Sequence, residues 1–259
     1  MKSPIVSRLC ATVLLAAAGA AMALPAIAQT AGTIRQGSPS RQGSTANDQG
    51  GFESTFNTLR AGQARMEFLG NPGRQKENWE AANRFASCAI NLNSDRVREL
   101  LDQAIAGKAK KRVELGDFVN RNQGCVVAAG GIDGDFLRGA MAQGIVTSSS
   151  EALPPPGDSA AVTKFLKTVS VPKMDKDDPF ITAQLVAECR VGFAPVAARG
   201  LLATEPDTPA ETGALAAMKA VTPQCDSLDT AKTKVTPRFE RAFAAQALYH
   251  WIGFDRNAG

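Results

Sequence analysis

The sequence predicts an all-α protein built from two related, disulfide-bearing multi-helix units, a tandem duplication that follows a signal peptide and a disordered leader. Three observations predict this class. Apolar residues recur mostly at helical spacing, one pattern of cysteine, arginine and leucine occurs twice, and the cysteines after the leader are even in number. Of the 259 residues 44% are hydrophobic, which is enough for a folded core.

The N-terminal residues 1–28 have the parts of a secretory signal peptide. A basic start precedes an apolar run at 11–23, and Ala26 and Ala28 supply the small residues of a cleavage site. The alternative is a membrane anchor, but the run is shorter than the roughly 20 apolar residues that a span needs. We expect cleavage before Gln29, no transmembrane segment after it, and a periplasmic or extracellular protein.

Differences in composition divide the rest of the chain into a leader, two helical units and a linker between them. Residues 29–54 carry almost no large apolar side chain and predict a disordered leader. Residues 147–160 contain three consecutive prolines and predict a Ser/Pro-rich linker. This leaves helical unit 1 at 55–146 and helical unit 2 at 161–259. At the start of unit 2, residues 161–171 partly alternate and are a candidate strand.

Each unit is expected to hold about four helices. Apolar stripes and stop signals place those of the first unit at 77–91, 95–106, 108–122 and 134–146. In the second unit a proline stands at each helix start, where its missing N–H does no harm. We expect these helices at 178–193, 195–203, 208–221 and 236–252.

The duplication is predicted by a pattern that occurs first from Cys88 and again from Cys189. It reads C-x9-R-x-L-L, then L-x9-C, then F-x-R-[GA]-x-x-A-Q-[GA]-[IL]. The repeated polar residues either satisfy helix ends and neighbouring helices or line equivalent ligand grooves. They are Arg98, Arg138 and Gln143, matched by Arg199, Arg241 and Gln246.

The four cysteines after the leader predict two disulfides. Four cysteines allow three pairings, but a duplicated unit should carry its own bond, so we expect Cys88–Cys125 and Cys189–Cys225. Redox or metal chemistry is the alternative. It is disfavoured because no C-x-x-C occurs and no histidine flanks a cysteine.

No catalytic residue, metal ligand or cofactor can be assigned. His250 is the one histidine, and its aromatic surroundings favour packing or helix capping. The acids Asp175, Asp177 and Asp178 precede a helix, where carboxylates complement the N-terminus without catalysis. A formal charge of +4 is too mild to indicate nucleic acid.

The signal peptide together with the repeated motif resembles a group of exported bacterial proteins that have no assigned activity. The likeness covers residues 79–146 and 180–252. It implies an all-α, disulfide-bearing envelope protein of unknown role and brings no catalytic residues.

The leading hypothesis is a non-enzymatic binding or scaffolding module of the cell envelope, with an envelope protein or peptide as partner. One alternative is an envelope hydrolase with unidentified catalytic carboxylates, which should show a carboxyl of shifted pKa in a cleft. Another is an inhibitor or chaperone-like partner protein.

Overall fold

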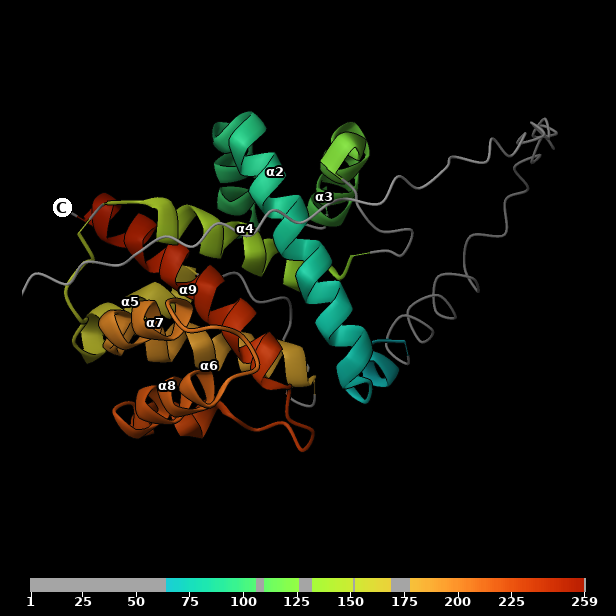
Figure 1. Cartoon of the computed structure of the whole chain (residues 1–259). Helices are drawn as coiled ribbons and strands as arrows, with labels where there is room; N and C mark the ends of the chain where they lie inside the picture. Colours follow the sequence, from blue (N-terminus) through green and yellow to red (C-terminus); the bar gives the residue numbers. More distant parts are fainter. Residues whose placement is uncertain (1–63, 106–109, 126–131, 151, 169–177, 259) are drawn as a thin grey trace, which may run out of the picture. The chain divides into compact units, whose positions relative to one another are not determined.

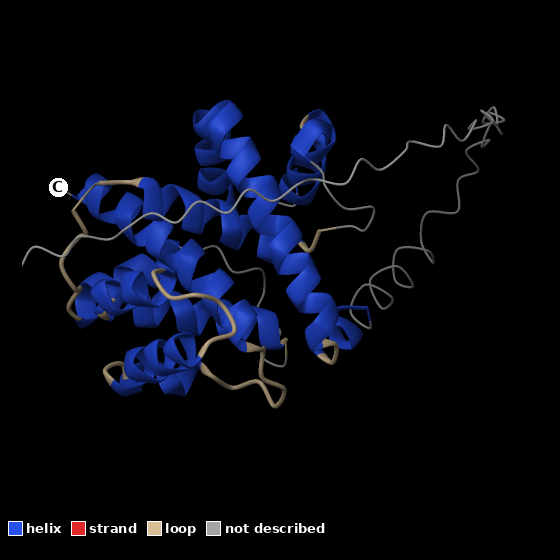
Figure 2. Ribbon diagram, in the orientation of Figure 1, coloured by secondary structure: helices blue, strands red, loops and turns tan. Residues whose placement is uncertain are grey.

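The computed structural model describes five stretches of the chain, to which all that follows refers: 64–105, 110–125, 132–150, 152–168 and 178–258. Every regular element in these stretches is helical (Figure 2), so the predicted all-α class is confirmed. The predicted signal peptide and the predicted leader lie outside the described residues.

After a helical segment at 64–69, the first half of the fold consists of a long helix, two further helices and one short 3-10 turn. They are α2 (Pro72–Ile105), α3 (Lys110–Arg121), η1 (Gln123–Cys125) and α4 (Gly134–Ser148). Two separate helices were expected where α2 runs, and α2 is interrupted between them at Asn93, whose backbone is not helical. The Asn93 side chain accepts from the N–H of Arg96 at 3.0 Å, so this asparagine restarts the helix after the kink.

The second half begins with α5 (Ser159–Thr168), where the sequence indicated a candidate strand. That prediction was wrong. Val162 and Phe165 are both buried, and a spacing of three places them on one face of a helix. The Phe165 ring lies 5.0 Å from that of Trp251, so packing against the last helix decides the conformation.

The remaining elements follow the prolines closely. They are α6 (Pro179–Phe193), α7 (Pro195–Leu202), α8 (Pro209–Ala220), η2 (Pro223–Leu228) and α9 (Pro237–Ala258). Each of the four α-helices starts at its proline, as predicted. Asp178 accepts from the N–H groups of Phe180 and Ile181, which makes it the N-cap of α6.

The described part of the Pro-rich segment between the halves is held to the helices. The N–H of Gly157 donates to the carbonyl of Gly192 in α6 at 2.8 Å. A Cβ at position 157 would lie 2.7 Å from the Trp251 ring, so only glycine allows this close approach.

Helices α4 and α9 lie side by side at the centre of the fold, with α2 packed on α4 and α6 on α9 (Figure 1). The Phe136 and Phe239 rings, which are matched in the predicted repeat, lie 4.3 Å apart. Three positions further along the repeat, Gly139 meets Ala242 so closely that a Cβ at position 139 would lie 2.6 Å from the Ala242 Cβ. Small residues at this position let the two helix backbones approach.

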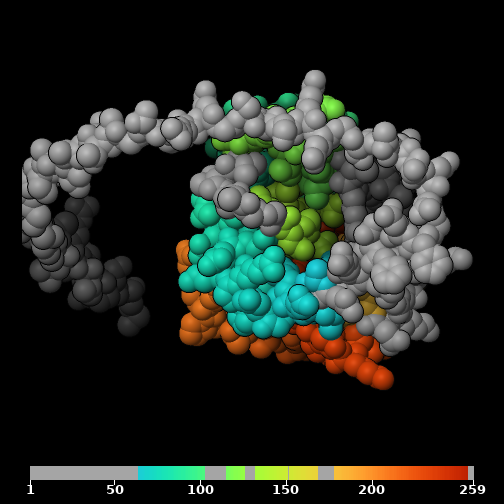
Figure 3. Space-filling model, turned by 90° about the vertical axis from the view of Figure 1, so that its right-hand side faces the viewer, coloured from blue at the N-terminus to red at the C-terminus, as the bar shows by residue number. Residues whose placement is uncertain are grey.

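Equivalent aromatic contacts flank this centre. Trp79 of α2 lies 5.5 Å from Phe136 with the rings at 82°. Phe180 of α6, 101 positions later, lies 5.0 Å from Phe239 with the rings at 79°. The start of α2 also lies beside the residues that precede α9 (Figure 3), where the Thr236 hydroxyl donates to Gln75 at 2.6 Å.

Both predicted disulfides are confirmed. The Cys88–Cys125 bond joins α2 to η1 with a Cα–Cα distance of 5.6 Å. The Cys189–Cys225 bond joins α6 to η2 with a Cα–Cα distance of 5.8 Å. Structural disulfides are typical of proteins in an oxidising compartment.

Among the described residues, no helix by itself has the length and apolar character needed to cross a membrane. One pair, α6 and α7, meets those criteria only when both helices are counted together, and the two are bent by 114°.

Candidate functional site

Two cavities open on the described surface, one beside each C-terminal helix of the two halves. Groove A lies against α6, α8 and α9, has a volume of about 350 Å³, and includes in its lining Val186, Arg190, Leu215, Met218, Lys219 and Glu240. Groove B lies against α3 and α4, has a volume of about 530 Å³, and includes in its lining Leu115, Val119, Asp133, Asp135, Leu137 and Arg138.

The linings of the two grooves match in part in the predicted repeat, although α6 lines groove A and its counterpart α2 does not line groove B. Leu115 in groove B corresponds to Leu215 in groove A, and both lie on the helix before the second cysteine of their half. At two further matched positions the chemistry differs. Val119 and Leu137 in groove B correspond to Lys219 and Glu240 in groove A, which form an ion pair at 2.8 Å.

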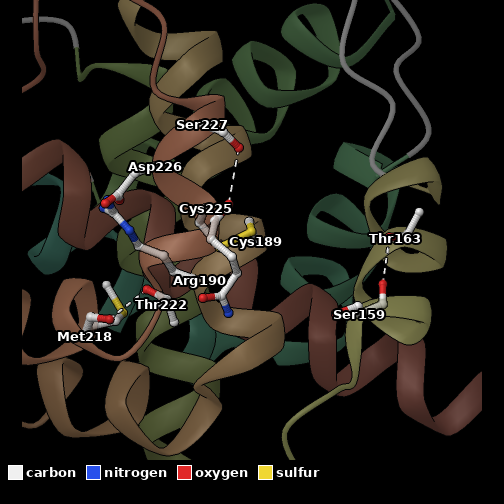
Figure 4. Close-up of a disulfide and its surroundings, with 10 residues drawn as sticks. Ser159, Thr163, Cys189, Arg190, Met218, Thr222, Cys225, Asp226 and Ser227 are labelled. Atoms are coloured by element: carbon white, nitrogen blue, oxygen red, sulfur yellow. Dashed lines mark hydrogen bonds and ion pairs between the residues drawn. A yellow bond between two sulfur atoms is a disulfide. The ribbon is translucent and has the colours of Figure 1, made fainter.

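Ion pairs surround groove A. Lys234 pairs with Asp229 at 2.8 Å, in the segment that leads to α9. Arg190 of α6 pairs with Asp226 of η2 at 2.9 Å. Figure 4 shows these two side chains pointing toward each other next to the Cys189–Cys225 bond, which fixes η2 against α6.

Groove B holds two carboxylates and two guanidinium groups. Asp135 pairs with Arg65 and, at 3.8 Å, with Arg138. The Arg65 guanidinium also lies 3.9 Å from the centre of the Phe180 ring, a cation–π contact. These contacts leave the charges of this groove balanced.

Asp133 in groove B has a raised pKa. Burial is the main cause and the negative charge of Asp135 adds to it, while hydrogen bonds from backbone N–H groups and the charge of Arg65 oppose it. The Asp133 carboxylate accepts from the N–H groups of Asp135 and Phe136. It therefore serves as the N-cap of α4 as well as part of the groove wall.

Arg241, one of the repeated arginines, is buried away from both grooves and connects its own helix, α9, to α4, α7 and α8. Its side chain is 1% exposed and pairs at 3.2 Å with Glu211, which is 2% exposed. Burial lowers the pKa of Arg241, and the charge of Glu211 acts against that shift. The five N–H groups of the guanidinium lie within hydrogen-bonding distance of six oxygens: Glu211 Oε1, Gln143 Oε1, Thr204 Oγ1 and the carbonyls of Leu201, Leu202 and Thr204.

The two repeated glutamines also bridge the halves. Gln143 accepts from Arg241 Nε at 3.0 Å, and Gln246 donates to the Asp135 carbonyl at 3.2 Å. Arg138 lies in the wall of groove B, whereas its matched residue Arg241 contacts neither groove. The repeated arginines therefore have different surroundings in the two halves.

The first pair of repeated arginines lies away from the grooves. Arg98 and Arg199 are both half-buried and contribute to the lining of neither cavity. The Arg98 carbonyl accepts from the Tyr249 hydroxyl at 3.4 Å, and the Arg199 carbonyl accepts from the N–H of Ala203 at 3.1 Å.

His250 lies inside the protein. Its Nδ1 is 2.8 Å from Glu188 Oε1, and the two side chains are 2% and 0% exposed. An imidazole in this position joins α6 to α9 and has no access to a substrate from solvent. The sequence located His250 on the last helix but gave no sign of Glu188, which lies 62 positions earlier.

Apart from Arg138, the charged residues of the grooves were missed by sequence reasoning; the partners in the Arg190–Asp226 and Lys219–Glu240 pairs are 36 and 21 positions apart. Glu211, the buried partner of Arg241, carries a local sequence signal. Thr208 caps α8, and the Glu211 carboxylate reaches back to the N–H of Asp207 at 2.8 Å, an arrangement that resembles a capping box. The spacing T-x-x-E before a helix is its sequence signature.

Among the described residues no group of three or more His, Cys, Asp or Glu side chains could hold a metal ion. Comparison of the chain with protein families, with curated proteins and with solved structures finds no match.

Proposed function

We propose that this chain is an exported, non-enzymatic binding or scaffolding module of the cell envelope, and that its ligands occupy groove A and groove B. One observation carries the proposal: each half has a cavity beside its last helix, and several lining residues of the two cavities match in the predicted repeat. A groove that recurs beside the equivalent helix is expected where both halves bind a ligand. The two disulfides support an exported protein.

The proposal includes a tandem duplication of one helical unit. It is supported by equivalent disulfides, by the equivalent ring contacts of Trp79 and Phe180, and by the contact of Phe136 with Phe239. A duplicated unit that binds a ligand would produce two sites, which then diverge. The replacement of Val119 and Leu137 by an ion pair in groove A fits such divergence.

Binding is favoured over catalysis because His250 and Arg241, two buried polar side chains, hold helices together. The His250 imidazole is buried against Glu188, and the Arg241 guanidinium is buried against helix-end carbonyls. Neither faces a groove. The charged groups that do line the grooves are mostly paired with each other, which suits recognition of a polar ligand.

Blocking each groove separately tests the proposal. Gly116 lines groove B, and no atom lies within 4 Å of a Cβ built there, so Gly116→Trp should fill the groove without distorting α3. Thr233 lines groove A and is exposed, so Thr233→Trp should fill that groove. The chain from residue 29 onward, immobilised, would be exposed to an envelope extract, and the bound peptides and proteins would be quantified by mass spectrometry.

Gly213→Trp is the matched control, because Gly213 is exposed, has the same empty surroundings and lines neither groove. We expect each groove variant to lose a set of ligands that the control retains. Recovery of the same ligands in the same amounts by all three variants would overturn the proposal.

A hydrolase is a second candidate, favoured by the raised pKa of Asp133 in groove B. Asp133→Asn preserves the N-cap while removing the acid. Turnover of ester, glycoside or peptide substrates by the wild type that disappears in Asp133→Asn would support catalysis. Equal rates in the two proteins, at the level of buffer, would leave binding as the function.

A further inference from the structure

Groove A combines an apolar wall with an excess of positive charge. Its lining includes three cationic side chains, Arg190, Lys219 and Lys234, and two carboxylates, Asp229 and Glu240. The two lysines pair with the two carboxylates. Arg190 is therefore the charge that the groove lining itself does not balance.

The partner of Arg190 comes from outside the lining and lies in solvent. The Asp226 side chain is 61% exposed, whereas that of Arg190 is 9% exposed. Water can solvate the Asp226 carboxylate once it rotates away from the guanidinium. The buried guanidinium has no such alternative and needs an acceptor.

Arg190 uses only one of the two adjacent N–H groups with which a guanidinium can bind a carboxylate. Asp226 accepts from Nη2 at 2.9 Å, while the buried Nε–H on the same side of the guanidinium has no acceptor among the described residues. A carboxylate that takes Nε and Nη2 together makes two parallel hydrogen bonds instead of one. Such a ligand would replace Asp226.

We propose that groove A binds an organic carboxylate with an apolar body, whose carboxylate displaces Asp226 from Arg190 and whose body lies on the apolar wall. This inference rests on the proposed binding function. Leu215 and Met218 supply part of that wall. The volume of about 350 Å³ lies at the lower end of the range of about 300–1,000 Å³ for ligand pockets, so the body is small.

Calorimetric titration with defined probes tests this proposal. Octanoate and N-acetyl-leucyl-leucine carry a carboxylate on an apolar body, and octanol and the amide of the same dipeptide are their neutral analogues. We expect at least one carboxylate to bind about tenfold or more tightly than its neutral analogue, as loss of a charged hydrogen bond implies. The tighter of the two carboxylates identifies a fatty acid or a peptide end as the source. Equal affinity for acid and neutral analogue would overturn the proposal, as would inorganic phosphate binding as tightly as the carboxylates.

Asp226→Asn gives the sharpest contrast. It removes the competing carboxylate, so we expect carboxylate affinity to rise several-fold, whereas a purely structural ion pair would leave affinity unchanged or lower it. Asp255→Asn is the control, because Asp255 is exposed on α9, does not line groove A and carries the same charge change. Arg190→Lys should weaken binding about tenfold or more by removing the two adjacent N–H groups, with the fold checked by circular dichroism. An unchanged affinity in Asp226→Asn would refute the proposed exchange.

The two proposals fail in different ways. If no carboxylate binds but Thr233→Trp still removes envelope ligands, the proposed function holds and the carboxylate assignment is wrong. If a carboxylate binds and Asp226→Asn strengthens it, while Thr233→Trp and Gly116→Trp leave envelope ligands unchanged, groove A is a carboxylate site and the proposed function is wrong.

Discussion

Removal of the Arg241 guanidinium should strongly destabilise the protein, because this group holds a junction of helices together. Arg241→Met leaves Glu211 as an uncompensated charge that is 2% exposed, and breaking a buried pair on one side lowers stability by about 3–5 kcal/mol. The carbonyls of Leu201 and Leu202 lose their donors as well. We therefore expect a loss in the upper part of that range.

Urea unfolding followed by circular dichroism measures this loss as a lower midpoint with an unchanged slope. Lys219→Met is the matched control, since the Lys219–Glu240 pair is partly exposed, at 43% and 24%, and should contribute no more than about 1 kcal/mol. Adding Glu211→Gln to Arg241→Met should cost less than the sum of the two single changes. An Arg241→Met protein no less stable than Lys219→Met would refute the reasoning.

Three further predictions concern stability. His250→Ala should lose at least about 1–3 kcal/mol in urea unfolding, because it leaves the Glu188 carboxyl buried without its hydrogen-bond partner; an unchanged stability would contradict the buried contact. Gly139→Ala should lose about 1–3 kcal/mol of unfolding free energy through overpacking against a helix backbone, whereas Gly213→Ala, with open space around it, should gain about 0.5–1 kcal/mol; equal effects would exclude the close approach. Since the pKa of Asp133 is raised above 3.8 in the folded protein, the folded state holds that proton more tightly, and stability should fall as pH rises from about 4 toward the raised value. As pH rises across this range, the melting temperature of the wild type should fall relative to that of Asp133→Asn. A relative rise would contradict the raised pKa of Asp133.

Local signals in the sequence predicted the helix boundaries well. Proline fixes the backbone at a helix start and lacks only an N–H that the helix does not use there, so α6 to α9 begin where their prolines stand. The helix α5 was missed because 161–171 was interpreted by its partial alternation. The spacing of Val162 and Phe165, the residues that are buried, was the better indicator.

The disulfides were predictable for a different reason. Spacing alone leaves three pairings of four cysteines, and the internal repeat selected the pairing that the structure shows. The same repeat identified Arg241, and the chemistry of a guanidinium predicted that it could satisfy helix-end carbonyls. Lining a groove was the alternative for the repeated arginines, and it applies to Arg138; the repeat did not indicate that the two counterparts would differ.

The grooves themselves could not be predicted. Arg190 and Asp226 are 36 positions apart, and His250 and Glu188 are 62 apart. Each pair forms only when distant helices pack, and residue types alone do not select partners at such distances. The burial of Arg190 and of His250 distinguishes these pairs from surface ion pairs. It also arises only when the helices pack.

The central claim is that ligands occupy groove A and groove B. Backbone amide chemical shifts of the isotope-labelled chain, recorded with and without a ligand recovered from the envelope extract, test it most directly. The largest shifts are expected at lining residues, around Leu215 and Lys219 for groove A or around Leu115 and Val119 for groove B. Largest shifts at residues remote from both linings, such as those of α5 or α7, would contradict the account.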